Sequence, residues 1–214
     1  MSFFSDISAI QNIVYIFSSI LFISGIKMLG KEDTAVRGNF LSASAMFIAV
    51  AITIINVVNP IIVLIGVSIG AVIGSLIALR VKMTSIPEMV ALFNGFGGLA
   101  TFFIAWSEFN AIPDNLFQYI VIMLTTYIGG VTFSGSIVAY GKLSEKLKVK
   151  KDSFVTKIFT TFFYASILFL VYSIGFTEII ELPINFYTVL LILTLLGGIG
   201  FVIPIGGGDM PVVI

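Results

Sequence analysis

The sequence predicts an all-α fold, a polytopic bundle of transmembrane helices, and two observations support this prediction. Apolar residues make up 58% of the 214 residues and charged residues only 10%, whereas a soluble domain carries roughly a quarter charged residues. The apolar residues also gather into runs of the length that a bilayer core requires, about 20 residues per helix. We therefore expect a transmembrane domain over residues 1–214.

Seven apolar runs are separated by charged residues or by Pro and Asn. Their approximate limits are Ile10–Met28, Phe40–Val58, Pro60–Leu79, Met89–Trp106, Leu116–Tyr140, Ile158–Phe176 and Ile184–Ile205. The runs show no alternation with a period of two and are too long for strands, so a transmembrane barrel is disfavoured. Seven helices, followed by the start of an eighth, are predicted.

The first three runs have features of retained, closely connected helices. The segment before the first run holds Asp6 and no Lys or Arg, unlike a cleaved signal peptide. Only a short turn before Pro60 separates the second and third runs, and this short separation predicts a tight hairpin. Proline fits the first turn of a helix, so Pro60 is expected to begin the third helix. The third run carries a stripe of small residues typical of helix packing, namely Gly66, Gly70 and Gly74.

The fourth and fifth runs each place small and polar residues on one helical face. In the fourth run this face comprises Pro87, Ala91, Asn94, Gly98, Thr101 and Ala105. In the fifth run it comprises Thr125, Gly129, Thr132, Ser136 and Ala139. Ser and Thr hydroxyls in membrane helices often donate only to the backbone carbonyl four residues earlier (i−4) in their own helix. This favours a structural role for the Ser and Thr residues. An amide at membrane depth is costly unless paired or hydrated, so Asn94 is a candidate functional residue.

The sixth run is a plain apolar helix, whereas the seventh contains residues able to interrupt it. These residues are Gly197, Gly198, Gly200 and Pro204. Three glycines at 206–208 follow, and then Asp209 is placed to cap an eighth helix that has Pro211 in its first turn.

All 11 basic residues lie at alternate connections between the runs. The first connection holds Lys27, Lys31 and Arg37, the third Arg80 and Lys82, and the fifth Lys142, Lys146, Lys148, Lys150, Lys151 and Lys157. The second, fourth and sixth connections hold no Lys or Arg, and acids occur there at Glu108, Asp114, Glu178 and Glu181. The positive-inside rule then predicts an external N-terminus and places the segment around Asp209 inside. A different helix count would scatter positive charge onto both sides.

The composition excludes several kinds of chemistry. Cys and His are both absent, which excludes disulfides, thiolate or histidine catalysis and the usual transition-metal sites. Equal numbers of acidic and basic residues provide no field that would attract nucleic acid. The glycines at 95, 97 and 98 fall inside a membrane run and do not fit a dinucleotide fingerprint. We expect no cofactor on this chain.

Glu88 is the remaining ionisable candidate. It follows Pro87 in the first turn of the fourth helix and lies about 9 Å along that helix from Asn94, at about 1.5 Å per residue. A helix dipole favours a carboxylate in the first turn. Capping and a functional role are therefore equally good interpretations.

Three stretches together resemble one family. Residues 81–91 (VKMTSIPEMVA), 131–143 (VTFSGSIVAYGKL) and 207–213 (GGDMPVV) resemble, in order and spacing, the membrane part of the beta subunit of proton-translocating NAD(P) transhydrogenase. The resemblance implies an enzyme complex in which hydride transfer between NAD(H) and NADP(H) is coupled to proton translocation. Family beta subunits have nine membrane helices, followed by an NADP-binding domain.

The resemblance also implies how this chain would take part. Both nucleotides would bind soluble domains outside residues 1–214, so this chain would bind no cofactor and would be inactive alone. Its partners would be the alpha subunit, the rest of the beta subunit and membrane lipid, in a dimer of the larger complex. The complex would lie in the inner (plasma) membrane of a cell.

Four residues match functional positions of the family. Asn94 stands where many members carry a proton-relay histidine, and some members place that histidine on the alpha subunit instead. Ser136, Glu88 and Asp209 match positions near the channel and at its cytoplasmic mouth. The resemblance therefore implies a proton pathway through these four residues, with the relay histidine supplied by another chain.

Two alternatives remain open from the residues. The first is a small ion or solute transporter that works without nucleotide; transporters often contain broken helices, although no internal repeat is evident here. The second is a degenerate fragment that inserts into the membrane without activity.

Overall fold

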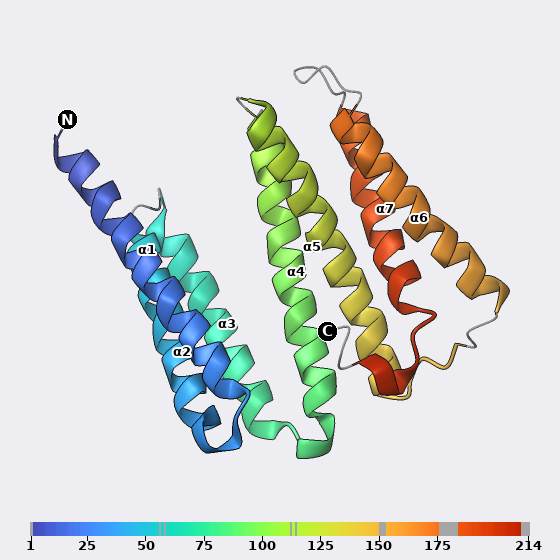
Figure 1. Cartoon of the computed structure of the whole chain (residues 1–214), viewed down its shortest axis with the longest axis horizontal. Helices are drawn as coiled ribbons and strands as arrows, with labels where there is room; N and C mark the ends of the chain where they lie inside the picture. Colours follow the sequence, from blue (N-terminus) through green and yellow to red (C-terminus); the bar gives the residue numbers. More distant parts are fainter. Residues whose placement is uncertain are drawn as a thin grey trace. The chain divides into compact units, whose positions relative to one another are not determined.

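The computed structural model describes residues 2–55, 57, 59–111, 113, 115–149, 153–175 and 184–210, and the side chains of residues 2–8, 184 and 185 are left aside. Within these residues every regular element is a helix (Figure 1). The helices are α1 (Ser2–Leu29), α2 (Glu32–Ile54), α3 (Pro60–Arg80), η1 (Met83–Ser85), α4 (Ile86–Asn110), α5 (Leu116–Leu143), α6 (Phe154–Gly175), α7 (Ile184–Val202) and η2 (Gly207–Asp209), where η denotes a 3₁₀ helix.

The predicted all-α class is confirmed, and each apolar run corresponds to one α-helix. In the part of the chain that the structure describes, six helices, α1 to α6, are long and apolar enough to cross a membrane. The part of α7 whose side chains are described, Phe186–Val202, is apolar but shorter. The chain is therefore a membrane protein of several apolar helices, and it divides into two compact units, Met1–Leu79 and Arg80–Ile214.

Several predicted helix limits differ from the observed ones, and two of these differences have clear physical reasons. The second helix begins at Glu32 rather than Phe40, because Glu32 and Asp33 suit the first turn of a helix. The seventh ends at Val202 rather than Ile205, because Pro204 lacks a backbone N–H and disfavours helical geometry in the residue before it.

In the first unit, α1 and α2 form a closely packed antiparallel pair. A Cβ added to Gly38 would lie 2.7 Å from the carbonyl oxygen of Gly25, so only glycine permits this approach. Towards the other end of the pair, Gln11 donates to the carbonyl of Ile52 at 3.1 Å. Glycine contacts and side-chain bonds to backbone thus hold this pair together, as expected for helices in lipid.

Helix α3 departs from the expected arrangement. The predicted tight hairpin with the second helix was wrong: α2 already ends at Ile54, and α2 packs extensively with α1 instead. Pro60 begins α3 as predicted. No described residue of α3 is buried, and Cβ atoms added to its glycine stripe (Gly66, Gly70 and Gly74) would meet nothing within 4 Å. Among the described residues of its own unit, the stripe therefore has no packing partner.

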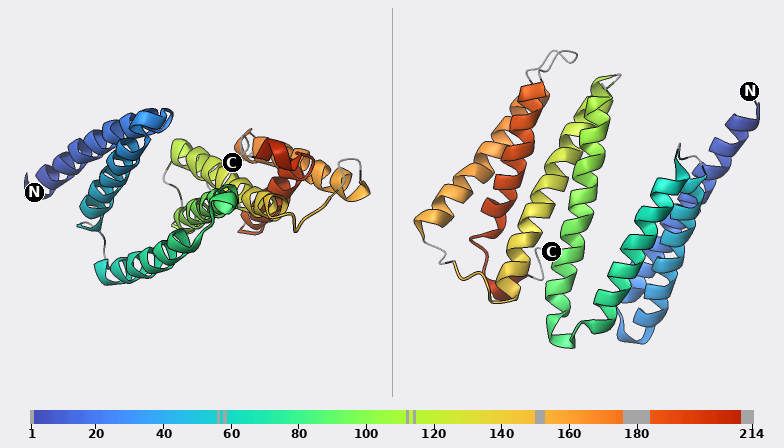
Figure 2. Two further views of the ribbon diagram at one scale, coloured as in Figure 1. Left: turned by 90° about the horizontal axis from the view of Figure 1, so that it is seen from below. Right: turned by 180° about the vertical axis from the view of Figure 1, so that it is seen from behind.

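In the second unit, α4 packs on α5, α5 on α7 and α7 on α6 (Figure 2). Asn115 caps α5, its Oδ1 accepting a bond from the backbone N–H of Gln118 at 2.9 Å. The backbones of α4 and α5 approach each other closely, since a Cβ on Gly98 would lie 2.8 Å from the amide nitrogen of Phe133. Helix α5 is central in this row and contributes the most buried residues.

The second unit has two apolar cores. One joins α4, α5 and α7 to the segment after α7 and consists of Ala91, Val138, Ala139, Val202, Ile203 and Met210. The other lies near the start of α5 and consists of Tyr119, Ile122, Met123, Leu170, Tyr187 and Leu190. The polar groups of the second core are paired: the Tyr119 hydroxyl donates to the carbonyl of Ser173 at 2.8 Å. The first core is the one that positions the candidate site.

Candidate functional site

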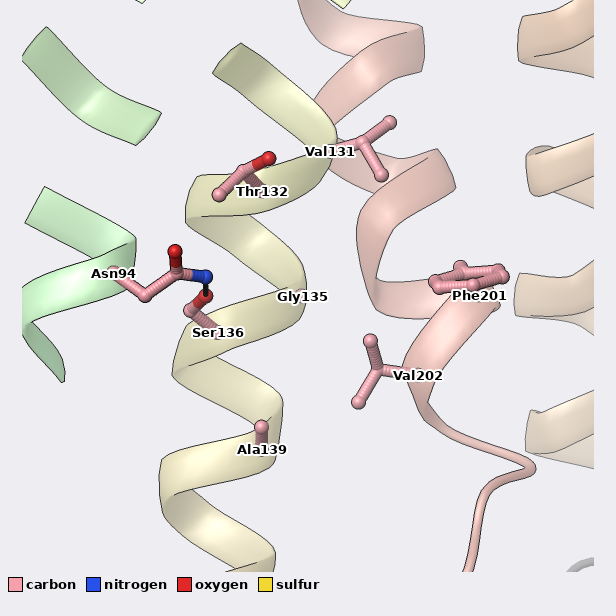
Figure 3. Close-up of a pocket in the computed structure, with 8 residues that line it drawn as sticks. All are labelled: Asn94, Val131, Thr132, Gly135, Ser136, Ala139, Phe201 and Val202. Atoms are coloured by element: carbon pink, nitrogen blue, oxygen red, sulfur yellow. Dashed lines mark hydrogen bonds between the residues drawn. The ribbon is translucent and has the colours of Figure 1, made fainter. Parts of the chain in front are cut away.

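Asn94 on α4 and Ser136 on α5 are directly bonded. The Nδ2 of Asn94 donates to the Oγ of Ser136 at 3.0 Å (Figure 3). Ser136 is 5% exposed, and Asn94 is half-buried. The helices can approach here because Gly95 faces Ser136: a Cβ on Gly95 would lie 3.1 Å from the Cβ of Ser136. The structure thus brings together two of the four predicted site residues.

A cavity of about 90 Å³ adjoins this bond. It is lined by Asn94, Val131, Thr132, Gly135, Ser136, Ala139, Phe201 and Val202, from α4, α5 and α7. A buried water needs about 10 to 15 Å³ of such space and two or more polar partners. The amide of Asn94 and the hydroxyls of Thr132 and Ser136 provide polar groups, so the cavity has room for a few water molecules.

The Ser136 hydroxyl is used differently from its neighbours on α5. Thr125 and Ser134 donate to their own i−4 carbonyls, at 2.6 and 3.0 Å. This is the structural role expected for membrane hydroxyls. Ser136 instead accepts a bond from another helix. The prediction of a structural role therefore fits Thr125, whereas Ser136 belongs to the wall of the cavity.

Glu88 lies in the first turn of α4, as predicted, and is half-buried. It is not part of the cavity lining. Its position in the first turn suits the helix dipole. The structure therefore places Glu88 on the same helix as Asn94 but does not bring its carboxylate to the cavity.

Asp209 also lies outside the cavity lining. It ends the short η2 helix, is exposed, and its backbone N–H donates to the carbonyl of Gly206 at 3.1 Å. The next residue, Met210, is fully buried and packs in the core that also contains Ala91 and Ala139. The predicted eighth helix, from Pro211 onward, lies outside the described residues.

Sequence reasoning missed the wall of the cavity that α7 provides. Phe201 and Val202 close the cavity on the side opposite Asn94 (Figure 3). Both are apolar residues in an apolar run, so no local pattern distinguishes them. The signal that could have found this wall was the run of glycines before them, because Gly198 lies against α5 at Val131 and Ser134.

The chemistry of this site is that of neutral polar groups. Among the described residues no cluster of three or more His, Cys, Asp or Glu could hold a metal ion. The glycines near Asn94 serve the contact with α5 at Gly95 and Gly98, and they lie inside α4. They do not form the strand-to-helix turn that binds a dinucleotide.

Six membrane-length helices among the described residues define a multi-pass membrane protein, and a small cavity with three polar side chains lies between α4, α5 and α7. The sequence matches the family model described as NAD(P) transhydrogenase beta subunit over residues 11–214. The chain therefore belongs to the NAD(P) transhydrogenase beta subunit family, and the resemblance expected from three short stretches is confirmed.

Two curated relatives also support membership of the beta subunit family. The NAD(P) transhydrogenase subunit beta of Rhodospirillum rubrum is 30% identical over 212 residues, covering 94% of this chain and 45% of the relative. A beta subunit from a particular strain of the same organism gives the same values. The chain thus spans a little under half the length of these relatives.

Proposed function

We propose that this chain forms the membrane proton pathway of an NAD(P) transhydrogenase and couples proton translocation to hydride transfer between nucleotides bound on other domains. The observation that carries the proposal is the hydrogen bond between Asn94 and Ser136. This bond lies on the wall of a cavity that has room for a few water molecules. The family membership supports the same conclusion.

The donor and acceptor inventory of Asn94 explains how such a pathway would work. An amide has two N–H donors and one oxygen acceptor, and one N–H is used by Ser136. The other N–H and Oδ1 remain for water or for a partner's side chain. An amide does not titrate near pH 7, whereas imidazole does. Asn94 would therefore orient water, and a histidine of a partner chain would carry the proton.

The charge distribution supports a defined orientation of this pathway. Lys142, Lys146 and Lys148 lie at the end of α5 and just after it. By the positive-inside rule this end faces the cytoplasm, together with Glu88 and Asp209 at the inner mouth. The N-terminus and the connection after α4 face the outside. The complex would lie in the plasma membrane.

Partners complete the proposal. The alpha subunit and the remainder of a beta subunit, with its NADP-binding domain, would supply both nucleotide sites, and the larger complex would be a dimer. This chain would bind neither NAD nor NADP. Hydride transfer would take place entirely on those other domains.

Reconstitution in liposomes tests the proposal. The chain alone is expected to show neither nucleotide oxidation nor proton flux, whereas co-reconstitution with the alpha subunit and the rest of beta gives hydride transfer linked to proton movement. Proton flux through the chain alone, without nucleotide, would instead support a nucleotide-independent transporter. Activity absent from every combination would support an inactive fragment.

A further inference from the structure

The C-terminal end of α7 leaves backbone carbonyls without helical partners. A helix leaves its last four carbonyls unpaired, and Pro204 has no N–H to donate to a preceding turn. Backbone bonds run from Ile203 to the carbonyl of Ile199 at 2.9 Å and from Ile205 to that of Val202 at 3.1 Å. In a membrane each unpaired carbonyl is costly, so this end needs further donors.

Lys142 supplies those donors from another helix. It lies in the last turn of α5, and its Nζ donates to the carbonyls of Val202 at 3.3 Å and Ile205 at 2.7 Å, and also to that of Ile203. An ammonium has three N–H donors, and here they meet three carbonyls. A cation is also favoured at the C-terminal end of a helix dipole.

We call the three hydrogen bonds of Lys142 the lysine clamp. The neighbouring Lys146 makes a different contact, so the clamp is not a general property of the lysines in this region. Its ammonium lies 5.6 Å from the centre of the Tyr140 ring, and the residue is exposed. Lys142 and Lys146 are four residues apart in the same basic region. Of these two lysines, only Lys142 bonds to the end of α7, so the pair provides a matched comparison.

The clamp holds one side of the segment that carries Asp209. Ile205, a carbonyl partner of Lys142, directly precedes the glycines at 206–208. On the other side of Asp209, Met210 is fully buried in the first core. Residues 206–209 are exposed between these two anchors. The position of Asp209 therefore depends on both.

Both anchors of the Asp209 segment, the hydrogen bonds of Lys142 and the buried Met210, involve a residue that lines the cavity. Val202 lines the cavity and offers its carbonyl to Lys142. Ala139 lines the cavity and belongs to the core that holds Met210. A rearrangement of the cavity wall would therefore reach the Asp209 segment through packed neighbours.

We infer that Lys142 is a positioning residue: its ammonium fixes the end of α7 and the Asp209 segment against α5, so that changes at the Asn94–Ser136 cavity reach this segment. The anchoring follows from the hydrogen bonds alone. Its consequence for coupling rests on the proposed function. Two experiments separate these parts.

The first experiment measures the anchor directly in the full chain. The sequence has no Cys, so a nitroxide on Gly207→Cys, where a side chain would meet nothing within 4 Å, reports the segment alone. In nanodiscs we expect Lys142→Met to raise the mobility that this label reports, and Lys142→Arg and Lys146→Met to leave it as in the otherwise unmodified chain. An unchanged mobility in Lys142→Met would overturn the inference.

A second label separates loss of the anchor from loss of the fold. Gly97→Cys lies on an open face of α4, and its spectrum should be unchanged by Lys142→Met. If both labels change, Lys142→Arg decides: an unchanged mobility at Gly207 with retained donors supports the anchor, and a raised mobility there contradicts it.

The second experiment measures coupling in the complex with the alpha subunit and the rest of beta. We expect Lys142→Met to lower the number of protons translocated per hydride transferred, with rescue by Lys142→Arg and no effect of Lys146→Met. An unchanged ratio together with a mobile Gly207 label would contradict the positioning role. If the unmodified complex is inactive, the proposed function fails while the spin-label result still decides the anchor.

Discussion

The Nδ2 of Asn94 on α4 lies 3.0 Å from the Oγ of Ser136 on α5, and this bond joins two helices at the wall of a cavity. The Ser136 hydroxyl orients the amide by accepting a bond from it, whereas Thr125 and Ser134 of α5 donate to their own i−4 carbonyls. The remaining polar atoms of Asn94 are thereby set for a water or a partner's side chain.

A double-mutant cycle measures this bond. Asn94→Ala and Ser136→Ala should show a coupling in the free energy of unfolding of about 0.6 kcal/mol and at most about 1.7, the range for interhelical bonds in membranes. Unfolding in mixed detergent micelles provides the measurement. Thr101→Ala and Thr125→Ala are the control pair, because each hydroxyl bonds its own helix, and their effects should be additive. A fully additive Asn94 and Ser136 pair would show that the bond contributes nothing.

Adjacent glycines of α4 should respond oppositely to alanine. A Cβ on Gly98 would lie 2.8 Å from the backbone nitrogen of Phe133, whereas one on Gly97 would meet nothing within 4 Å. Gly98→Ala should destabilise the protein by about 1 to 3 kcal/mol through overpacking. Gly97→Ala should be neutral or stabilising by up to about 1 kcal/mol, because alanine is the better helix former. Equal effects in a detergent unfolding assay would argue against the α4–α5 contact.

Water should reach the side chains that line the cavity but not those that are fully buried in the protein. Thr132 lines the cavity, whereas Thr126 is fully buried and bonded to the hydroxyl of Tyr187 at 2.7 Å. A cysteine replacing Thr132 should react with a small water-soluble thiol reagent, and one replacing Thr126 should not. The absence of native cysteine makes the background zero. Protection at both positions would mean that the cavity is closed to water.

The orientation in the membrane can be tested with the same chemistry. Lys146 follows α5 and Ala111 follows α4, and both are exposed. In intact cells an impermeant thiol reagent should label Ala111→Cys, and it should label Lys146→Cys only after the membrane is opened. The reverse pattern would invert the topology inferred from the positive-inside rule.

Helix type and position were predictable because the apolar runs are long and end at charges, Pro or Asn. The limits of the helices were harder to predict. The start of α2 at Glu32 depends on acidic residues that are favourable in a first turn. The end of α7 at Val202 depends on Pro204. Asn94 was predicted as a site residue because an amide is unusual inside an apolar helix, whereas Ser136 was predicted only through the family resemblance. Their contact and the wall formed by Phe201 were not predictable, since both depend on which helices pack together.

The lysine clamp illustrates the same limit. Lys142 counted in the sequence only as one of 11 basic residues that define topology. Its three carbonyl partners lie far away along the chain, at the last residue of α7 and just after it. A long-range contact of this kind leaves no local signal, because neither the lysine nor an apolar helix end is unusual alone.

The most direct measurement of the central claim is nucleotide-driven proton movement in liposomes that contain this chain, the alpha subunit and the rest of beta. Asn94→Leu keeps a similar volume but removes every hydrogen bond to Ser136 and to water. We predict that it abolishes proton movement, while Thr101→Val, at a hydroxyl bonded within its own helix, leaves it intact. Full proton movement in the Asn94→Leu complex would contradict the assignment of this cavity as the proton pathway.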